Sequence, residues 1–319
     1  MNRSLKSLLA VAALVALPAF AKNDALSLIP NDAVSVGVVR LADLRTSPLS
    51  MTLFEQTDKV GANGESDRFL DDAGLDPKKD IDVLVVAMAP RTNLGSDAEV
   101  LIAADGRFNV DRLTTALLGR GATQKNGYLL MPQETGDSGK RGAIAFPSNS
   151  LVLLGSESAV TEALASRANG GTTFLTSSGL GREVARIEPR ASAWAIVDVA
   201  RAQRLTGAAK IPQSHAALNA AIKNVSTVAL WATDTGDALK LGGFGLAHDE
   251  ETLQLVEDTL RGALAAMRLA VQDKVPEMVP VLRKFSVSRS NDAVSISGTI
   301  PASDVKKLTD AKTRLHAEK

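Results

Sequence analysis

The sequence contains no cysteine. Disulfide bonds, thiolate zinc sites, iron–sulfur clusters and a cysteine nucleophile are therefore excluded, as is a lipid anchor on an N-terminal cysteine. Aromatic residues make up only 3% of the chain, and Trp194, Trp231 and Tyr128 are its only tryptophans and tyrosine. A stacking platform for single-stranded nucleic acid needs more aromatic side chains than this.

Net charge is also lacking, because 36 lysines and arginines balance 36 aspartates and glutamates. A neutral chain has no strong electrostatic hold on nucleic acid or on an anionic membrane. The three histidines, His215, His248 and His316, are too far apart in sequence to match a zinc motif. No phosphate-binding loop, nucleophile elbow or dinucleotide-binding glycine pattern is present, so we predict no cofactor.

Export is predicted by residues 1–21. Arg3 and Lys6 precede the apolar run Leu8–Leu17, and a proline and an Ala-Phe-Ala cleavage site follow, which is the pattern of a signal peptide. A buried N-terminal helix is the alternative, since the run is shorter than the ~20 apolar residues that span a membrane. We expect an exported protein, periplasmic or extracellular, that starts at Lys22 and has no stable membrane span after cleavage.

Apolar alternation and helical spacing predict an α+β order of elements in the rest of the chain. In the first half we expect strands at Ala33–Val39, Ile81–Ala89, Glu99–Ala104, Gly127–Met131, Gly142–Phe146 and Leu151–Gly155, and helices at Leu41–Gln56, Val110–Leu118 and Glu157–Ala168. In the second half we expect strands at Ser192–Val199, Val225–Thr233, Leu239–Ala247, Phe285–Arg289 and Ala293–Ile300, and helices at Glu250–Val275 and Ser303–Leu315. Asn109, Ser156 and Asp249 are the expected N-caps of three of these helices.

We interpret both halves as one order, strand-helix-strand-strand-helix-strand-strand-helix, which starts again at Ser192–Val199. We therefore predict two tandem copies, residues 22–169 and 174–319, joined by the glycine-rich linker 170–173. Each copy should form largely antiparallel sheets with helices on one face. A chance recurrence of a generic pattern is the alternative. The apolar stripe of Glu250–Val275 is interpreted as facing the core, with a partly exposed groove or dimer face as the other possibility.

Several segments resemble a known group of proteins. They are ALSLIPNDAVSVGVVRLADLRTSPL (residues 25–49), GLDPKKDIDVLVVA (74–87), GRFNVDRL (106–113) and GSESAVTEAL (155–164). Together with the signal peptide, they resemble an uncharacterised group of secreted bacterial proteins of unknown function with paired α/β repeats. The resemblance implies a location in the envelope or outside the cell, and it carries over no functional residue.

One acidic cluster contains the candidate metal ligands. Carboxylate oxygens suit Ca²⁺, but the spacing matches no EF-hand, and the lysines between the acids favour a solvated turn. The three candidates are Asp76, Asp80 and Asp82.

Two functions fit these observations. The favoured one is a non-catalytic binding or structural protein of the bacterial envelope, whose partner is an unknown protein or envelope ligand, because no nucleophile lies near a base in any known pattern. The alternative is a periplasmic or secreted hydrolase with a dispersed carboxylate site at Asp80, Asp82 or Asp105.

Overall fold

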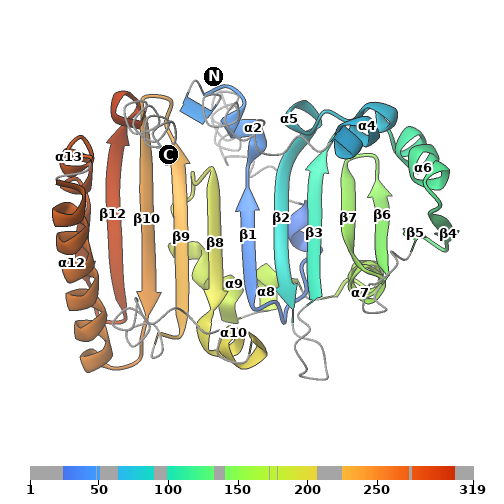
Figure 1. The fold of residues 1–319 in the computed structure, drawn as a ribbon. Helices are drawn as coiled ribbons and strands as arrows, with labels where there is room; N and C mark the ends of the chain where they lie inside the picture. Colours follow the sequence, from blue (N-terminus) through green and yellow to red (C-terminus); the bar gives the residue numbers. More distant parts are fainter. Residues whose placement is uncertain are drawn as a thin grey trace, which may run out of the picture.

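The protein is described by a computed structural model that covers residues 24–47, 49–50, 64–89, 99–132, 141–171, 173–177, 179–206, 225–272 and 275–305. The predicted α+β class is confirmed. A single antiparallel 12-stranded sheet has the order β11-β12-β10-β9-β8-β1-β2-β3-β7-β6-β5-β4 (Figure 1). Both halves of the chain therefore contribute to one continuous sheet. The predicted signal peptide and most of the predicted helix Ser303–Leu315 lie outside the described residues.

The strands follow the predicted order along the chain. The first half contributes β1 (Ser35–Val39), β2 (Ile81–Ala89), β3 (Glu99–Gly106), β4 (Thr123–Lys125), β5 (Tyr128–Leu130), β6 (Gly142–Ser148) and β7 (Leu151–Ser156). The second half contributes β8 (Ala193–Asp198), β9 (Thr227–Asp234), β10 (Ala238–Leu246), β11 (Ser286–Arg289) and β12 (Ala293–Pro301). Only β4 was not predicted, because its three residues are all exposed and show no apolar alternation.

The helices are mostly short. They are α1 (Asp24–Ser27), α2 (Leu41–Leu44), α4 (Gly64–Ala73), α5 (Pro77–Asp80), α6 (Val110–Gly119), α7 (Glu157–Ala168), α8 (Phe174–Ser177), α9 (Gly179–Glu183), the 3-10 helix η1 (Val184–Arg186), α10 (Val199–Thr206), α12 (Glu250–Gln272) and α13 (Met278–Leu282). Within the part of the chain that the structure describes, none combines the length and apolar character needed to cross a membrane.

The three predicted N-caps are confirmed. The side chain of Asn109 accepts a hydrogen bond from the third residue of α6, and those of Ser156 and Asp249 do the same for α7 and α12. The expected helix Leu41–Gln56 was too long, since α2 ends at Leu44 and residues 51–56 lie outside the described part. A proline at position 48 disfavours helical backbone just before it, which explains the early end.

Strand order is the same on both sides of the boundary between β1 and β8. Moving outward, β1-β2-β3-β7-β6 on one side corresponds to β8-β9-β10-β12-β11 on the other. The pairing register corresponds as well. Gly37 lies opposite Ala195 at the boundary. From this pair, one row of opposed residues continues through Val86, Ile102, Leu154 and Ile144, and the other through Leu230, Gly243, Ile296 and Val287.

The main hydrophobic core lies on one face of the sheet, which we call the inner face; it carries Val36 and Val38. Helices α1, α7, α8 and α9 cover this face, and their buried side chains pack with those of the strands in one cluster. Phe174 and Ile29 are among its largest fully buried members. Figure 1 shows α8 and α9 behind the sheet.

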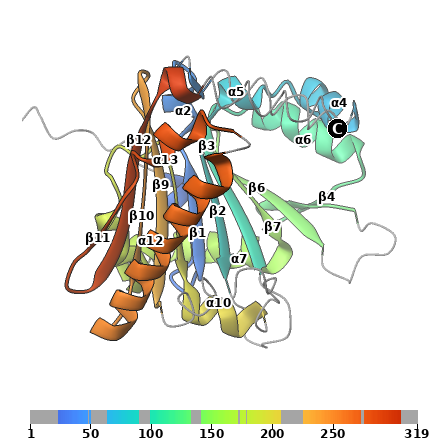
Figure 2. The same ribbon diagram turned by 60° about the vertical axis from the view of Figure 1, so that its left-hand side comes forward.

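On the opposite, outer face, the helices among the described residues pack mainly over the two ends of the sheet. Helices α4 and α6 pack over β2, β3, β6 and β7 around Phe108 and Leu113, and α12 packs over β11 and β12 through Leu253 and Val256. Figure 2 shows these two helical covers at opposite ends of the sheet. Helices therefore lie against both faces, where the sequence predicted one. Strand β7 is apolar on both sides, as its consecutive buried residues 151–153 show, and both sides need cover.

Candidate functional site

The middle of the outer face lies between the two helical covers. Strand alternation and register place three outward residues of each of β2, β1, β8 and β9 there, and we call this set the central floor. Its members are Leu84, Val86, Met88, Val39, Gly37, Ser35, Ala193, Ala195, Val197, Val228, Leu230 and Ala232. None is charged, and only Ser35 has a polar side chain. The floor is therefore a continuous apolar area, whose edge residues Leu84 and Val228 pack against the two helical covers.

Large side chains of the central floor are open to solvent. Leu230 is 58% exposed, Val86 38% and Met88 36%, and Val100 on the neighbouring β3 is 43% exposed. Two small residues, Gly37 and Ala195, lie directly opposite each other at the centre. Isolated exposed apolar residues are ordinary, whereas a contiguous apolar patch marks an interaction site in a soluble protein.

Helix α12 borders the central floor with an uncharged side. Its charged side is held to the outermost strand β11, because Arg289 forms ion pairs with Glu250 at 2.6 Å and Glu257 at 3.1 Å, and Arg261 donates to the Val287 carbonyl at 3.3 Å. Helical periodicity puts the opposite side toward the floor. That side carries Thr259, Ala263, Met267 and Ala270. Most of the predicted apolar stripe packs on the sheet, while Met267 is exposed.

The predicted metal ligands are engaged within the loop before β2. Asp76 caps α5 by accepting from the Lys78 amide at 3.1 Å and pairs with the Lys79 ammonium at 2.8 Å. The hydrogen bond from Lys79 holds the pKa of Asp76 below its usual value. Asp80 accepts from the Asp76 amide at 2.8 Å. Among the residues that the structure describes, no group of three or more histidines or acids is placed to hold a metal ion.

The three carboxylates of the hydrolase alternative come to the same end of β2 and β3. Asp82 forms ion pairs with Arg45 at 2.6 Å and Arg107 at 3.4 Å. Asp105 accepts from the Ala25 amide, whose nitrogen lies 3.0 and 3.1 Å from the two carboxylate oxygens. Burial raises the pKa of Asp105 to about 6, and the negative charges of Asp24 and Asp82 add to this rise. Each of these acids, Asp80 included, is thus occupied by a neighbouring donor.

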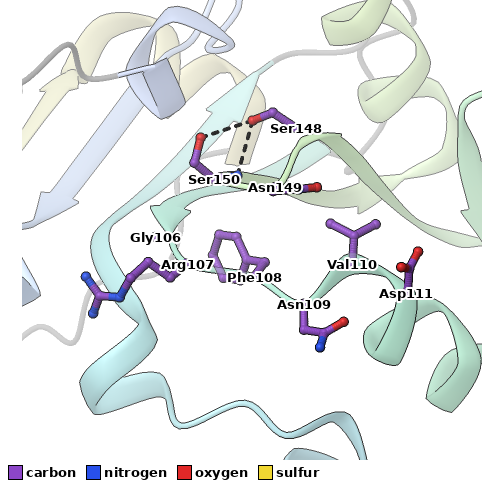
Figure 3. Close-up of a pocket in the computed structure, with 9 residues that line it drawn as sticks. All are labelled: Gly106, Arg107, Phe108, Asn109, Val110, Asp111, Ser148, Asn149 and Ser150. Carbon is purple, nitrogen blue, oxygen red and sulfur yellow. Dashed lines mark hydrogen bonds between the residues drawn. The ribbon is translucent and has the colours of Figure 1, made fainter.

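Figure 3 shows a shallow polar pocket beside these acids. The end of β3, the start of α6 and the turn between β6 and β7 line it. The hydroxyls of Ser148 and Ser150 lie 3.1 Å apart, and Phe108 is buried below them. The lining includes no histidine or lysine, its one acid is Asp111, and its Arg107 is paired with Asp82.

A second pocket occupies the corresponding place in the other half. It has a volume of about 360 Å³ and is lined by His248, Arg186 and Asp292, among others. Arg186 pairs with Asp292 at 2.6 Å and with Glu183 at 2.7 Å. The hydrogen bond from Arg186 lowers the pKa of Asp292. His248 is exposed next to the capping Asp249, which is the position expected for a histidine at a helix start.

The fold is similar to that of TP0453. Three solved structures of that protein, crystal forms I, IV and III, match with TM-scores of 0.48, 0.46 and 0.48 and sequence identities of 10%, 12% and 11%. Each match covers 90% of this chain, and 98%, 96% and 97% of the respective TP0453 chain. At such identities and TM-scores the similarity implies nothing about function. No protein-family model and no curated protein matches the sequence.

Proposed function

We propose that this chain is an exported, non-catalytic binding protein and that the central floor is its binding surface. The observation that carries the proposal is the continuous uncharged floor between the two helical covers. Strand pairing keeps the exposed leucine, valine and methionine side chains in contact with water. This contact is unfavourable, and a bound apolar ligand would remove it. Export is proposed from the signal-peptide pattern of residues 1–21.

The occupant that fits is a small apolar ligand with a hydrocarbon chain. Four strands about 4.8 Å apart and five residues of ~3.4 Å each give a floor of roughly 300 Å². A stable protein interface buries ~800 Å² on each partner, so the floor alone is too small for a second copy or another protein. The four strands have neighbours on both sides, and their backbone groups are already used in the sheet. The floor therefore has almost no free hydrogen-bonding groups that a polar ligand could use.

A neutral solvatochromic dye such as Nile red, displaced by decanol, tests this proposal. Ala195→Asp places a charge at the centre of the floor, at an exposed position where the fold tolerates a side chain. We expect the dye to bind the wild type and to bind Ala195→Asp at least about tenfold more weakly, because a carboxylate under an apolar ligand loses its hydration.

The matched control is Leu269→Asp, which changes a 70% exposed leucine on α12 away from the floor. It should bind the dye like the wild type. Equal binding by a folded Ala195→Asp variant would contradict the proposal, as would dye binding that decanol does not displace.

We also propose that residues 22–169 and 174–319 arose by duplication, with 170–173 as the join. The common strand order and the corresponding cross-strand rows on either side of the β1–β8 boundary support this origin. In such a duplicated fold, the apolar floor lies at the join of the two halves, between their helical covers.

A further inference from the structure

A row of polar residues crosses the inner face at the end of five neighbouring strands. The Arg40 amide donates to the Ser192 carbonyl at 2.7 Å, and the Ser192 amide donates to the Ala232 carbonyl at 2.8 Å, which places Ser192 beside Thr233. Lys240 lies opposite Thr233 and also opposite Thr299. We call these five residues the polar row: Arg40, Ser192, Thr233, Lys240 and Thr299.

The polar row combines two cations with three hydroxyls and includes no acid. Strand alternation puts its side chains on the same face as the apolar core residues Trp194 and Ile196. Ser192 and Thr233 are only 3% and 6% exposed, whereas Lys240 is exposed. The row therefore leads from solvent at the lysine to a buried hydroxyl pair beside the arginine.

Two atoms of the row are buried without a hydrogen-bond partner. They are the Nε of Arg40 and the Oγ1 of Thr233. Buried polar atoms nearly always have a partner, and leaving one without a partner costs stability. Arg40 also forms no ion pair with any acid in the described part of the chain. Ser47 Oγ, in the segment after α2, lies by the carboxylate of Asp234 and is not part of the row.

The acid nearest in sequence, Asp234, does not provide a carboxylate partner for the side chains of the polar row. Asp234 follows Thr233, so alternation turns its carboxylate to the outer face. There it accepts hydrogen bonds from the Ser50 hydroxyl and, at 2.8 Å, from the Gly236 amide. Only its own amide reaches the row, by donating to Ser192 Oγ at 3.1 Å.

The corresponding row of the first half has the opposite charge. The Asp198 amide donates to the Val34 carbonyl at 2.8 Å, as the Arg40 amide does to the Ser192 carbonyl. Beyond Val34, that row continues toward Glu99, the first residue of β3. The same backbone arrangement thus holds acids in one half and cations in the other. Packing alone does not require Arg40 and Lys240 at these positions.

We propose that the polar row is a binding site for a small oxyanion, a carboxylate or a phosphate group. Arg40 Nε and the Thr233 hydroxyl donate to the anion's oxygens, the Ser192 hydroxyl has its proton available as a third donor, and Lys240 attracts the anion at the open end. The site lies on the face opposite the central floor, so its existence does not depend on the proposed function.

Calorimetric titration with inorganic phosphate and, separately, with acetate tests the site on the full chain at constant ionic strength set by chloride. We expect saturable binding of at least one of the two anions. The anion that binds shows whether the site takes a phosphate or a carboxylate group. Arg40→Gln should weaken binding at least about tenfold, because it removes a charge-assisted donor. Thr233→Val should weaken it roughly fivefold by the loss of one neutral hydrogen bond. Arg283→Gln, at an exposed arginine after α13, is the matched control and should bind like the wild type.

Thermal unfolding without added anion separates binding from a structural role. Removing a buried hydroxyl that has no partner leaves stability unchanged or raises it, so Thr233→Val should unfold at or above the wild-type temperature. A structural role predicts the reverse, a lower unfolding temperature with unchanged binding. If Arg40→Gln does not fold, Lys240→Gln at the exposed end replaces it and should also weaken binding. Absence of saturable binding of both anions, or equal binding by these variants, would overturn the proposal.

Discussion

The carboxyl group of Asp105 should destabilise the folded protein at neutral pH, and Asp105→Asn should remove that cost. Burial raises the pKa of this group from 3.8 to about 6, so the folded protein binds its proton more tightly than the unfolded chain does. The stability that this group contributes is therefore greatest below about pH 4, falls as the pH rises toward 6, and is constant above that. An asparagine keeps an oxygen that accepts from the Ala25 amide and has no charge to desolvate.

The full pKa shift corresponds to about 3 kcal/mol, at roughly 1.4 kcal/mol per pH unit. Asp105 is only partly buried, and solvent screening reduces the expected gain of Asp105→Asn to about 1–2 kcal/mol at pH 7.5. At pH 4 the difference from the wild type should shrink to nearly zero. Other acids titrate in both proteins alike, so the difference between the two isolates this one group.

Urea unfolding followed by circular dichroism, at several pH values from 4 to 8, measures this difference. Asp111→Asn, at an exposed acid of α6, is the control and should show no comparable pH-dependent gain. An Asp105→Asn variant that is less stable than the wild type at pH 7.5 would refute the reasoning. It would mean that the hydrogen bond between the ionised carboxylate and Ala25 outweighs the cost of burial.

Three further predictions follow from the sequence and the packing. Mass spectrometry of envelope and medium fractions should find a mature N-terminus at Lys22, and an intact Met1 there would contradict cleavage. Leu253→Ala should lower the free energy of unfolding by ~2–5 kcal/mol because this leucine of α12 is fully buried, whereas Leu269→Ala on the same helix should change it by less than ~0.5 kcal/mol. A screen with peptidase, esterase, phosphatase and glycosidase substrates, with and without divalent metal, should show no turnover; activity that disappears in a folded Asp82→Asn variant would instead support the hydrolase.

Local signals predicted the strands and caps well, because alternation and capping depend on neighbours in sequence. The serine, asparagine and aspartate before three helices each cap the expected turn. Helix α4 was missed because its ten residues, GESDRFLDDA, contain few apolar side chains, and among them Phe69 packs against α6 and the sheet. Its helical state depends on this tertiary contact, which no local pattern shows.

The central floor and the polar row could not have been predicted from the sequence. Alternation in β9 distinguishes the two sides of the strand. It does not show that α12 and α4 pack over other strands and leave Leu230 exposed. The polar row combines residues that lie in or directly next to five strands, and its members become neighbours only through register. Asp105 was predicted as a possible catalytic acid, whereas its partner Ala25 lies 80 positions away in the sequence.

The antiparallel contact between β1 and β8 joins the two halves as subunits of a symmetric dimer would be joined, edge to edge. In a homodimer, every residue occurs twice about the two-fold axis, so corresponding positions must carry the same side chain. One continuous polypeptide has no such constraint: Arg40 and Asp198 hold equivalent backbone positions with opposite charge. The molecule can therefore have a positive and a negative end on a nearly symmetric scaffold, a directionality that two identical subunits could not provide.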